Sequence, residues 1–275
     1  MRNILKSILA LSAIFSVASC NVDNIGTLYQ HEGSDNGVSF TQSSVSYSEL
    51  AASTTSLVVT LGRAASDAAQ TVNIASTLPE GIVVPTSVSF AAGQGSADLV
   101  LDLSGMAVGK AYKGVISLAS ESDYNSLGIS SVNVTLQKAY SWSHYGTVKI
   151  TDDLVTCAFG VENLTWEVEA DKADGFEVYR LLDPYGANYL YNEPGDYKLG
   201  AKWVIDCTNP NAVTFDRTYL GFDWGYGEFN VWPLEAGKMV NKVITFPVDG
   251  IAFNLPDYGT FKANNNGLFA IDLNL

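Results

Sequence analysis

The sequence predicts an all-β protein of two domains, an N-terminal β-sandwich followed by a second β-sandwich or jelly-roll-like domain. Short runs of alternating apolar and polar residues recur along the chain, and this period of two is typical of half-buried strands. Turn-forming Gly and Pro residues separate the runs. The aromatic content rises steeply near residue 140, which predicts a domain boundary there.

The first segment, 1–19, has the layout of an export signal. Arg2 and Lys6 supply positive charge, and a mostly apolar run follows from 8 to 17. This run is too short to form a stable transmembrane helix. We therefore expect the segment to direct export and to be removed.

Cys20 follows directly after this segment. The three residues before it are small and resemble a bacterial lipobox: Val17, Ala18 and Ser19. In lipoproteins the signal is cut before such a cysteine, so the resemblance implies that Cys20 carries the lipid chains. The alternative is an ordinary signal peptide with an incidental cysteine. Segment 20–36 is rich in polar residues and is predicted to be a lipidated tether.

The formal net charge of −14 limits the partners of the chain. Binding to nucleic acid needs a basic face, and binding to anionic headgroups needs cations near the surface. We therefore expect no nucleic-acid partner. Membrane attachment is expected through acyl chains on Cys20, with about 0.8 kcal/mol from each buried methylene.

The segment 37–139 is predicted to be the first sandwich. Its strand runs carry apolar residues at every second position, as in 57–61, 99–103 and 132–136. Turn sequences such as Leu78-Pro79-Glu80-Gly81 separate these runs. About seven short strands in about 100 residues are typical of an antiparallel β-sandwich.

Parts of this segment resemble Calx-β or immunoglobulin-like modules, which occur near the N-termini of Bacteroidota surface lipoproteins. The resemblance lies in Val38–Phe40, Ser43–Glu49 and Leu57–Arg63. It implies an Ig-like sandwich on a protein anchored in the cell outer membrane, at the extracellular face. Calx-β domains bind calcium through clustered acids, whereas the acids of this segment are scattered. Calcium binding is therefore not expected.

The segment 140–275 is predicted to be a second, aromatic-rich all-β domain. It contains 24 aromatic residues, whereas residues 1–139 contain seven. Apolar and polar residues alternate in 164–169 and 269–274, and Gly and Pro turns recur. The segments 142–147 and 179–185 resemble C-terminal domains of Bacteroidota lipoproteins, a resemblance that implies a location but no activity.

Cys157 and Cys207 remain once Cys20 is used for lipid attachment. Export places them in an oxidising compartment, where the pair can form a disulfide. Two separate buried thiols are the alternative, because both residues lie in apolar, strand-like sequence. A zinc site is not expected, because no CxxC motif is present and the chain has only two His residues.

The sequence contains no recognisable catalytic arrangement. His31 lies in the tether and His144 at the start of the second domain, and no Ser lies in a GxSxG motif. Several acids are candidates for a glycosidase pair, but solvated surface charge explains them better: Asp206, Asp216, Asp223, Glu228 and Glu235. We therefore expect no catalytic residue, no metal site and no cofactor, and a protein that is not an enzyme.

Two aromatic clusters are candidate ligand-binding surfaces. The first, within 219–232, includes aromatic residues beside Gly or Asp, and the second surrounds 185–191. Aromatic rings bordered by polar side chains suit the apolar faces and hydroxyl groups of sugars. Core packing is the alternative for each ring. The candidate binding residues are Phe222, Asp223, Trp224, Tyr226, Tyr189 and Tyr191.

These observations predict a surface-exposed envelope lipoprotein with a binding role and a glycan as the favoured ligand. Expected partners are the membrane, through Cys20, and either a polysaccharide or an outer-membrane protein complex. The first alternative is a structural or adhesive envelope protein that binds a protein partner. The second is a carbohydrate-active enzyme.

Overall fold

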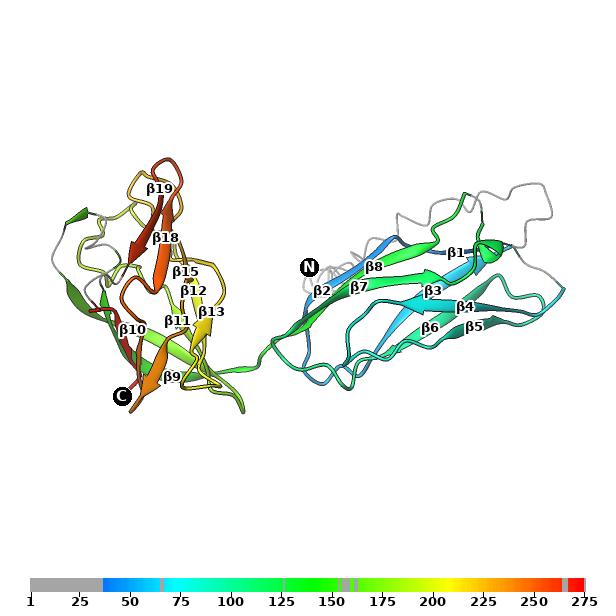
Figure 1. Cartoon of the computed structure of the whole chain (residues 1–275), viewed down its shortest axis with the longest axis horizontal. Helices are drawn as coiled ribbons and strands as arrows, with labels where there is room; N and C mark the ends of the chain where they lie inside the picture. Colours follow the sequence, from blue (N-terminus) through cyan, green and yellow to red (C-terminus); the bar gives the residue numbers. More distant parts are fainter. Residues whose placement is uncertain are drawn as a thin grey trace, which may run out of the picture. The chain divides into compact units, whose positions relative to one another are not determined.

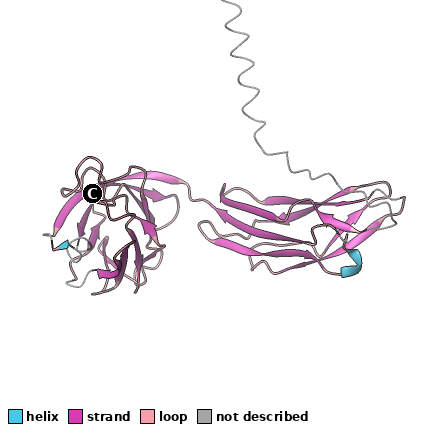
Figure 2. Cartoon of the chain, turned by 90° about the horizontal axis from the view of Figure 1, so that it is seen from above, coloured by secondary structure: helices cyan, strands magenta, loops and turns pink. Residues whose placement is uncertain are grey.

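The computed structural model is an all-β protein, and Figure 2 shows that its regular structure is mostly strand. The structure describes residues 37–64, 67–125, 127–152, 154, 159–160, 163–263 and 267–274. The chain divides into two compact units, Met1–Ala139 and Tyr140–Leu275, at the step in aromatic content. The predicted signal and tether lie outside the described residues. Within the described part of the chain, no helix is long and apolar enough to cross a membrane.

The first unit is a β-sandwich of two sheets. A five-stranded sheet has the order β2-β8-β7-β4-β5, and a three-stranded sheet has the order β1-β3-β6. The pairs are antiparallel except β2 with β8, which run parallel. The elements are β1 (Val38–Phe40), β2 (Ser44–Leu50), β3 (Ser56–Arg63), β4 (Gln70–Ser76), β5 (Ser87–Phe90), β6 (Ser96–Asp102), β7 (Ala111–Leu118), the 3-10 turn η1 (Glu121–Asp123) and β8 (Ser131–Lys138).

The alternation in the sequence places one face of each strand in the core of this unit. In β6, Leu99 and Leu101 are buried, whereas Asp98 and Asp102 are exposed. Successive side chains of a strand point to opposite faces, so the period of two separates the core from the solvent. The prediction of a sandwich for this segment is confirmed.

The second unit also contains two sheets (Figure 1). An eight-stranded sheet has the order β13-β12-β11-β10-β9-β20-β17-β16, and a four-stranded sheet has the order β14-β15-β18-β19. The strands are β9 (Trp142–Asp152), β10 (Leu164–Ala173), β11 (Val178–Leu182), β12 (Lys202–Asp206), β13 (Thr214–Phe215), β14 (Thr218–Tyr219), β15 (Asn230–Pro233), β16 (Lys238–Val240), β17 (Val243–Thr245), β18 (Ile251–Leu255), β19 (Gly259–Ala263) and β20 (Ala270–Asp272).

A single core cluster collects side chains from both sheets of the second unit. Val148 and Ile150 come from β9, whereas Val231 and Phe253 come from β15 and β18. Many aromatic rings are fully buried in this cluster: Tyr185, Tyr189, Trp203, Phe222, Phe229, Phe253 and Phe269. The high aromatic content of this unit therefore largely reflects the packing of its core.

Candidate functional site

Two of the residues predicted to bind a ligand are buried in the structure, so the prediction is wrong for them. Phe222 is 0% exposed and Tyr189 is 1% exposed. Phe222 stacks between Tyr185, at 4.9 Å between ring centroids, and Phe229, at 4.3 Å. A glycine and an aspartate beside Phe222 indicated an exposed loop, but the ring turns inward because the core offers stacking partners. Neither ring presents a surface to a ligand.

A buried carboxylate anchors the tyrosines of this core. Asp152, at the end of β9, is 1% exposed, and its side chain accepts hydrogen bonds from Tyr185 Oη at 3.0 Å and from Tyr189 Oη at 3.5 Å. Burial is the main cause that raises the pKa of both tyrosines above the ordinary value, and the Asp152 charge adds to it. Both phenols therefore stay protonated and act as donors.

Trp224 lies over this buried layer and is partly exposed. Its backbone has a φ of 44°, in the left-handed region, within a turn that is closed by a 2.7 Å bond from Tyr226 N to Asp223 O. The indole Nε1 donates to Asn192 Oδ1 at 2.8 Å, and Asn192 Nδ2 donates to Tyr185 O at 2.7 Å. The ring also stacks on Tyr189 at 6.4 Å. Trp224 is thus held in one orientation with part of its surface in solvent.

Tyr226 extends the exposed aromatic surface toward the β18–β19 turn. Its ring meets Tyr258 edge to face at 5.4 Å, and Tyr258 is 63% exposed. Gly227, with a φ of 86°, is pressed against the same turn, because a Cβ built there would lie 2.7 Å from Pro256 Cγ. The close approach of the two loops therefore brings the two tyrosines together. We call Trp224, Tyr226 and Tyr258 the outer aromatic cluster.

Polar groups border the outer aromatic cluster. Asp223 is partly exposed and accepts a bond from Gly225 N at 3.1 Å through Oδ1. Glu228 is exposed, with Lys198 Nζ at 3.9 Å. Tyr191, another predicted binding residue, is partly buried and packs edge to face on the buried Tyr189 at 5.8 Å. Of the six predicted residues, the structure leaves Trp224, Tyr226 and Asp223 as the ones suited to a ligand surface.

The sequence reasoning missed Tyr258. Asp257-Tyr258-Gly259 is a turn sequence with an aromatic residue beside glycine, the same signal that singled out Trp224 and Tyr226. The isolated position of Tyr258 in the sequence concealed it, because a single aromatic residue does not form a cluster until the chain folds.

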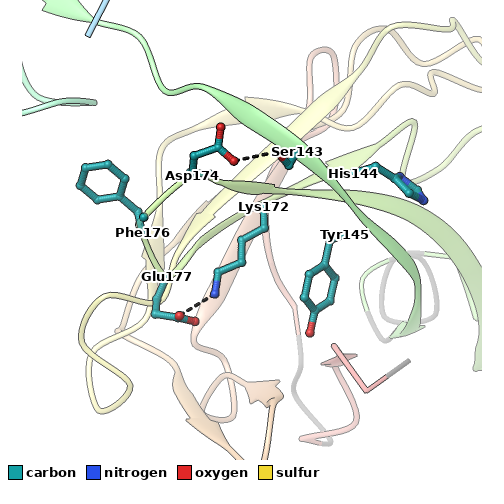
Figure 3. A pocket seen from close by; sticks show the side chains of 9 residues that line it. Ser143, His144, Tyr145, Lys172, Asp174, Phe176 and Glu177 are labelled. Atoms are coloured by element: carbon teal, nitrogen blue, oxygen red, sulfur yellow. Dashed lines mark hydrogen bonds and ion pairs between the residues drawn. The ribbon is translucent and has the colours of Figure 1, made fainter. Parts of the chain in front are cut away.

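A hollow of about 480 Å³ lies at the start of β9 and at the β10–β11 hairpin (Figure 3). Polar groups of its lining bind one another: Lys172 Nζ lies 2.5 Å from Glu177 Oε1, and Ser143 Oγ donates to Asp174 Oδ1 at 2.7 Å. No predicted site residue lines it. The lining residues are Ser143, His144, Tyr145, Lys172, Ala173, Asp174, Gly175, Phe176 and Glu177.

The remaining predicted site residues concern lipid attachment and the disulfide. Val17, Ala18, Ser19 and Cys20 lie outside the described residues, as does Cys157. Cys207 has no disulfide partner among the described residues and is 1% exposed, and burial is the main cause that raises the pKa of its thiol to about 12. The bridge to Cys157 stays a prediction.

Comparison with known proteins leaves the family open. The chain matches no family model and no curated protein. Among solved structures it is similar to a protein from Bacteroides ovatus ATCC 8483 described as a "putative carbohydrate binding protein". The sequence identity is 12% and the TM-score is 0.29, over 86% of this chain and 74% of that chain. A likeness at this level carries no inference about the fold or the ligand of this chain.

Proposed function

We propose that this chain is a cell-envelope lipoprotein whose second unit binds a glycan at the outer aromatic cluster. The observation that carries the proposal is that the exposed Tyr258 meets Tyr226, which like Trp224 is partly exposed, in a turn that also contains Asp223 and Glu228. The flat faces of such rings suit the C–H faces of sugar rings, and the carboxylates accept hydrogen bonds from hydroxyls.

Trp224 and Tyr226 pack against the core, with Phe159 at 5.2 Å and 5.6 Å between ring centroids, and both residues stay partly exposed. Tyr189 and Phe222, whose rings contact Trp224, are fully buried. The hydrogen bond from the Trp224 indole to Asn192 fixes the ring before a ligand arrives. A ring that is already ordered loses little conformational freedom on binding, and this favours affinity.

Glycan-array screening of the protein, followed by calorimetry with the best oligosaccharide, tests this proposal. Trp224→Ala and Tyr258→Ala are expected to weaken binding about tenfold or more, about 1.4 kcal/mol, with the fold retained. Tyr47→Ala is the matched control, because Tyr47 is 50% exposed but lies in the first unit. Absence of any glycan ligand, or unchanged affinity in both cluster variants, would contradict the proposal.

The proposed anchor is Cys20, and the proposed location is the extracellular face of the outer membrane. The support is the export signal, the small residues before Cys20 and the resemblance to Bacteroidota surface lipoproteins. Cys20→Ala is expected to leave the protein soluble or as an uncleaved precursor, measured by membrane fractionation. A mature variant that stays firmly bound to the membrane would refute the anchor.

We also propose binding without catalysis. The support is that the sequence holds no nucleophile–base motif and that solvated surface charge explains the candidate acids. Incubation with the oligosaccharide that binds best is expected to release no reducing ends. Release that is abolished by Asp223→Asn or Glu228→Gln would show an enzyme instead.

A further inference from the structure

One face of the four-stranded sheet β14-β15-β18-β19 carries two rows of side chains on the side away from Val231 and Phe253. Val231 of β15 and Phe253 of β18 pair across the strands and are buried, so the residues next to them point outward. The register gives the first row as Asn230, Asn254 and Thr260, and the second row as Trp232, Ala252 and Lys262. Thr260 and Lys262 are exposed, the other polar residues and Trp232 are partly exposed, and Ala252 is covered at 1% exposure. Figure 1 shows β15, β18 and β19 side by side.

Arg217, just before β14, lies over this face and is held there by two contacts. Its guanidinium carbon is 4.2 Å from the centre of the Trp232 ring, and one terminal nitrogen donates to Asn254 Oδ1 at 2.9 Å. The side chain is nevertheless exposed. A guanidinium fixed by an aromatic ring and one hydrogen bond is oriented in advance, and it has further N–H groups to donate.

The other two described arginines differ from Arg217, because their guanidinium groups are satisfied within the protein. Arg180 donates from Nε and from a terminal nitrogen to Asp171 Oδ2. Arg63 is 3% exposed and donates to oxygen atoms of Gln94, Gln70, Ala68 and Ala91.

Among the ion pairs of the described residues, none includes Arg217. Acidic residues outnumber basic residues in this chain by 29 to 15, so most basic side chains have carboxylates available as partners. The Arg217 guanidinium is therefore held in one orientation but has no carboxylate partner among the described residues.

We propose that this face binds an anionic sugar residue of the glycan, with the Arg217 guanidinium as its anion-binding group. This inference rests on the proposed glycan-binding function and names its ligand class. A planar guanidinium donates two parallel hydrogen bonds to a carboxylate, and it also binds the oxygens of a sulfate ester. Asn230 and Thr260 supply amide and hydroxyl groups to the ring hydroxyls of the same sugar.

The net charge of −14 opposes the approach of an anion, and local contacts must overcome it. The screening length is about 8 Å at physiological ionic strength, so distant carboxylates contribute little at the face. Five acids lie within two residues of a strand of this sheet in sequence, and they are Asp216, Glu228, Glu235, Asp249 and Asp257. Lys262 contributes a second cation to the same face.

The test uses matched acidic and neutral oligosaccharides. Galacturonate, glucuronate and mannuronate oligomers are each compared with their carboxyl-reduced forms, and a sulfated galactan oligomer is compared with its desulfated form. Calorimetry with the protein is expected to give at least about tenfold tighter binding of an anionic form than of its neutral counterpart. The uronate and sulfate pairs show which anion the face selects.

Variants then assign the preference to Arg217. Arg217→Gln is expected to bind the acidic and neutral forms equally, and Arg217→Lys is expected to restore only part of the preference, because an ammonium lacks the planar pair of donors. Asn254→Ala, which removes the acceptor that orients the guanidinium, is expected to reduce the preference. Lys113→Gln removes the same charge from an exposed position of the first unit and is expected to change nothing.

The outcomes separate this inference from the proposed function. Equal binding of every acidic and neutral pair by the wild-type protein overturns the inference and leaves glycan binding intact. A preference that persists in Arg217→Gln overturns it as well. Absence of binding by all of the anionic and neutral forms, and by the glycan array, overturns the proposed function together with the inference.

Discussion

Phe222→Ala is expected to destabilise the second unit strongly, although Phe222 lies in a loop between β14 and β15. The ring is 0% exposed and stacks on Tyr185 at 4.9 Å and on Phe229 at 4.3 Å, and it also meets Trp224 edge to face. Removing a fully buried Phe ring costs about 3–5 kcal/mol of unfolding free energy, because the surrounding side chains collapse only partly into the cavity. For a unit of this size, the melting temperature should fall by about 10–20 °C.

Tryptophan fluorescence measures this effect selectively, because all five Trp residues lie in the second unit. Guanidinium titration of the wild type and the variant gives the difference in unfolding free energy. Phe176→Ala is the matched control: Phe176 is 38% exposed at the β10–β11 turn, so its loss should cost less than about 1 kcal/mol. A cost below about 1 kcal/mol for Phe222→Ala would refute the assignment of this ring to the core.

Three further predictions address the buried and paired groups of the second unit. Tyr185→Phe removes a 3.0 Å hydrogen bond to the buried Asp152 and should cost about 1–3 kcal/mol, measured by the same titration; an unchanged midpoint would contradict it. The Lys172 ammonium, followed by the Tyr179 hydroxyl, lowers the pKa of Glu177 from its ordinary value of 4.5. The stability from this pairing should therefore be full above about pH 4.5 and lost as the pH falls through the lowered pKa, so that the wild type and Glu177→Gln converge in acid; a constant difference between them would refute this. Cys207 should resist thiol reagents at pH 8 in the native protein, because burial raises its pKa to about 12, and should react after unfolding without reductant; no reaction after unfolding would indicate a disulfide.

The strands and their buried faces could be predicted where the period of two is unbroken. Leu99 and Leu101 in β6, and Trp166 and Val168 in β10, are buried as the alternation indicates. In a strand, the position of one side chain fixes the face of the next, so local sequence is sufficient. The step in aromatic content likewise falls at the division between the units.

The candidate site could be predicted only in part, because turns carry no such period. Phe222, Trp224 and Tyr226 lie in similar Gly-rich sequence, yet Phe222 is buried while the other two reach solvent. Whether each ring is buried or exposed depends on residues that are distant in sequence, such as Tyr185, Asn192 and Tyr258. The exposed arginine on the four-stranded sheet depends in the same way on Asn254, which is distant in sequence.

The parallel pairing of β2 with β8 has a mechanical consequence. Residues Ser44 to Tyr47 of β2 pair in parallel with Asn133 to Leu136 of β8. The chain enters this pair at the start of β2 and leaves it at the end of β8 toward the second unit, so a pull on the two sides acts along the strands in opposite directions. The hydrogen bonds between them then bear the load together and must break together, instead of opening one after another as in a zipper. This geometry makes the first unit resistant to a pull applied between the start of β2 and the end of β8.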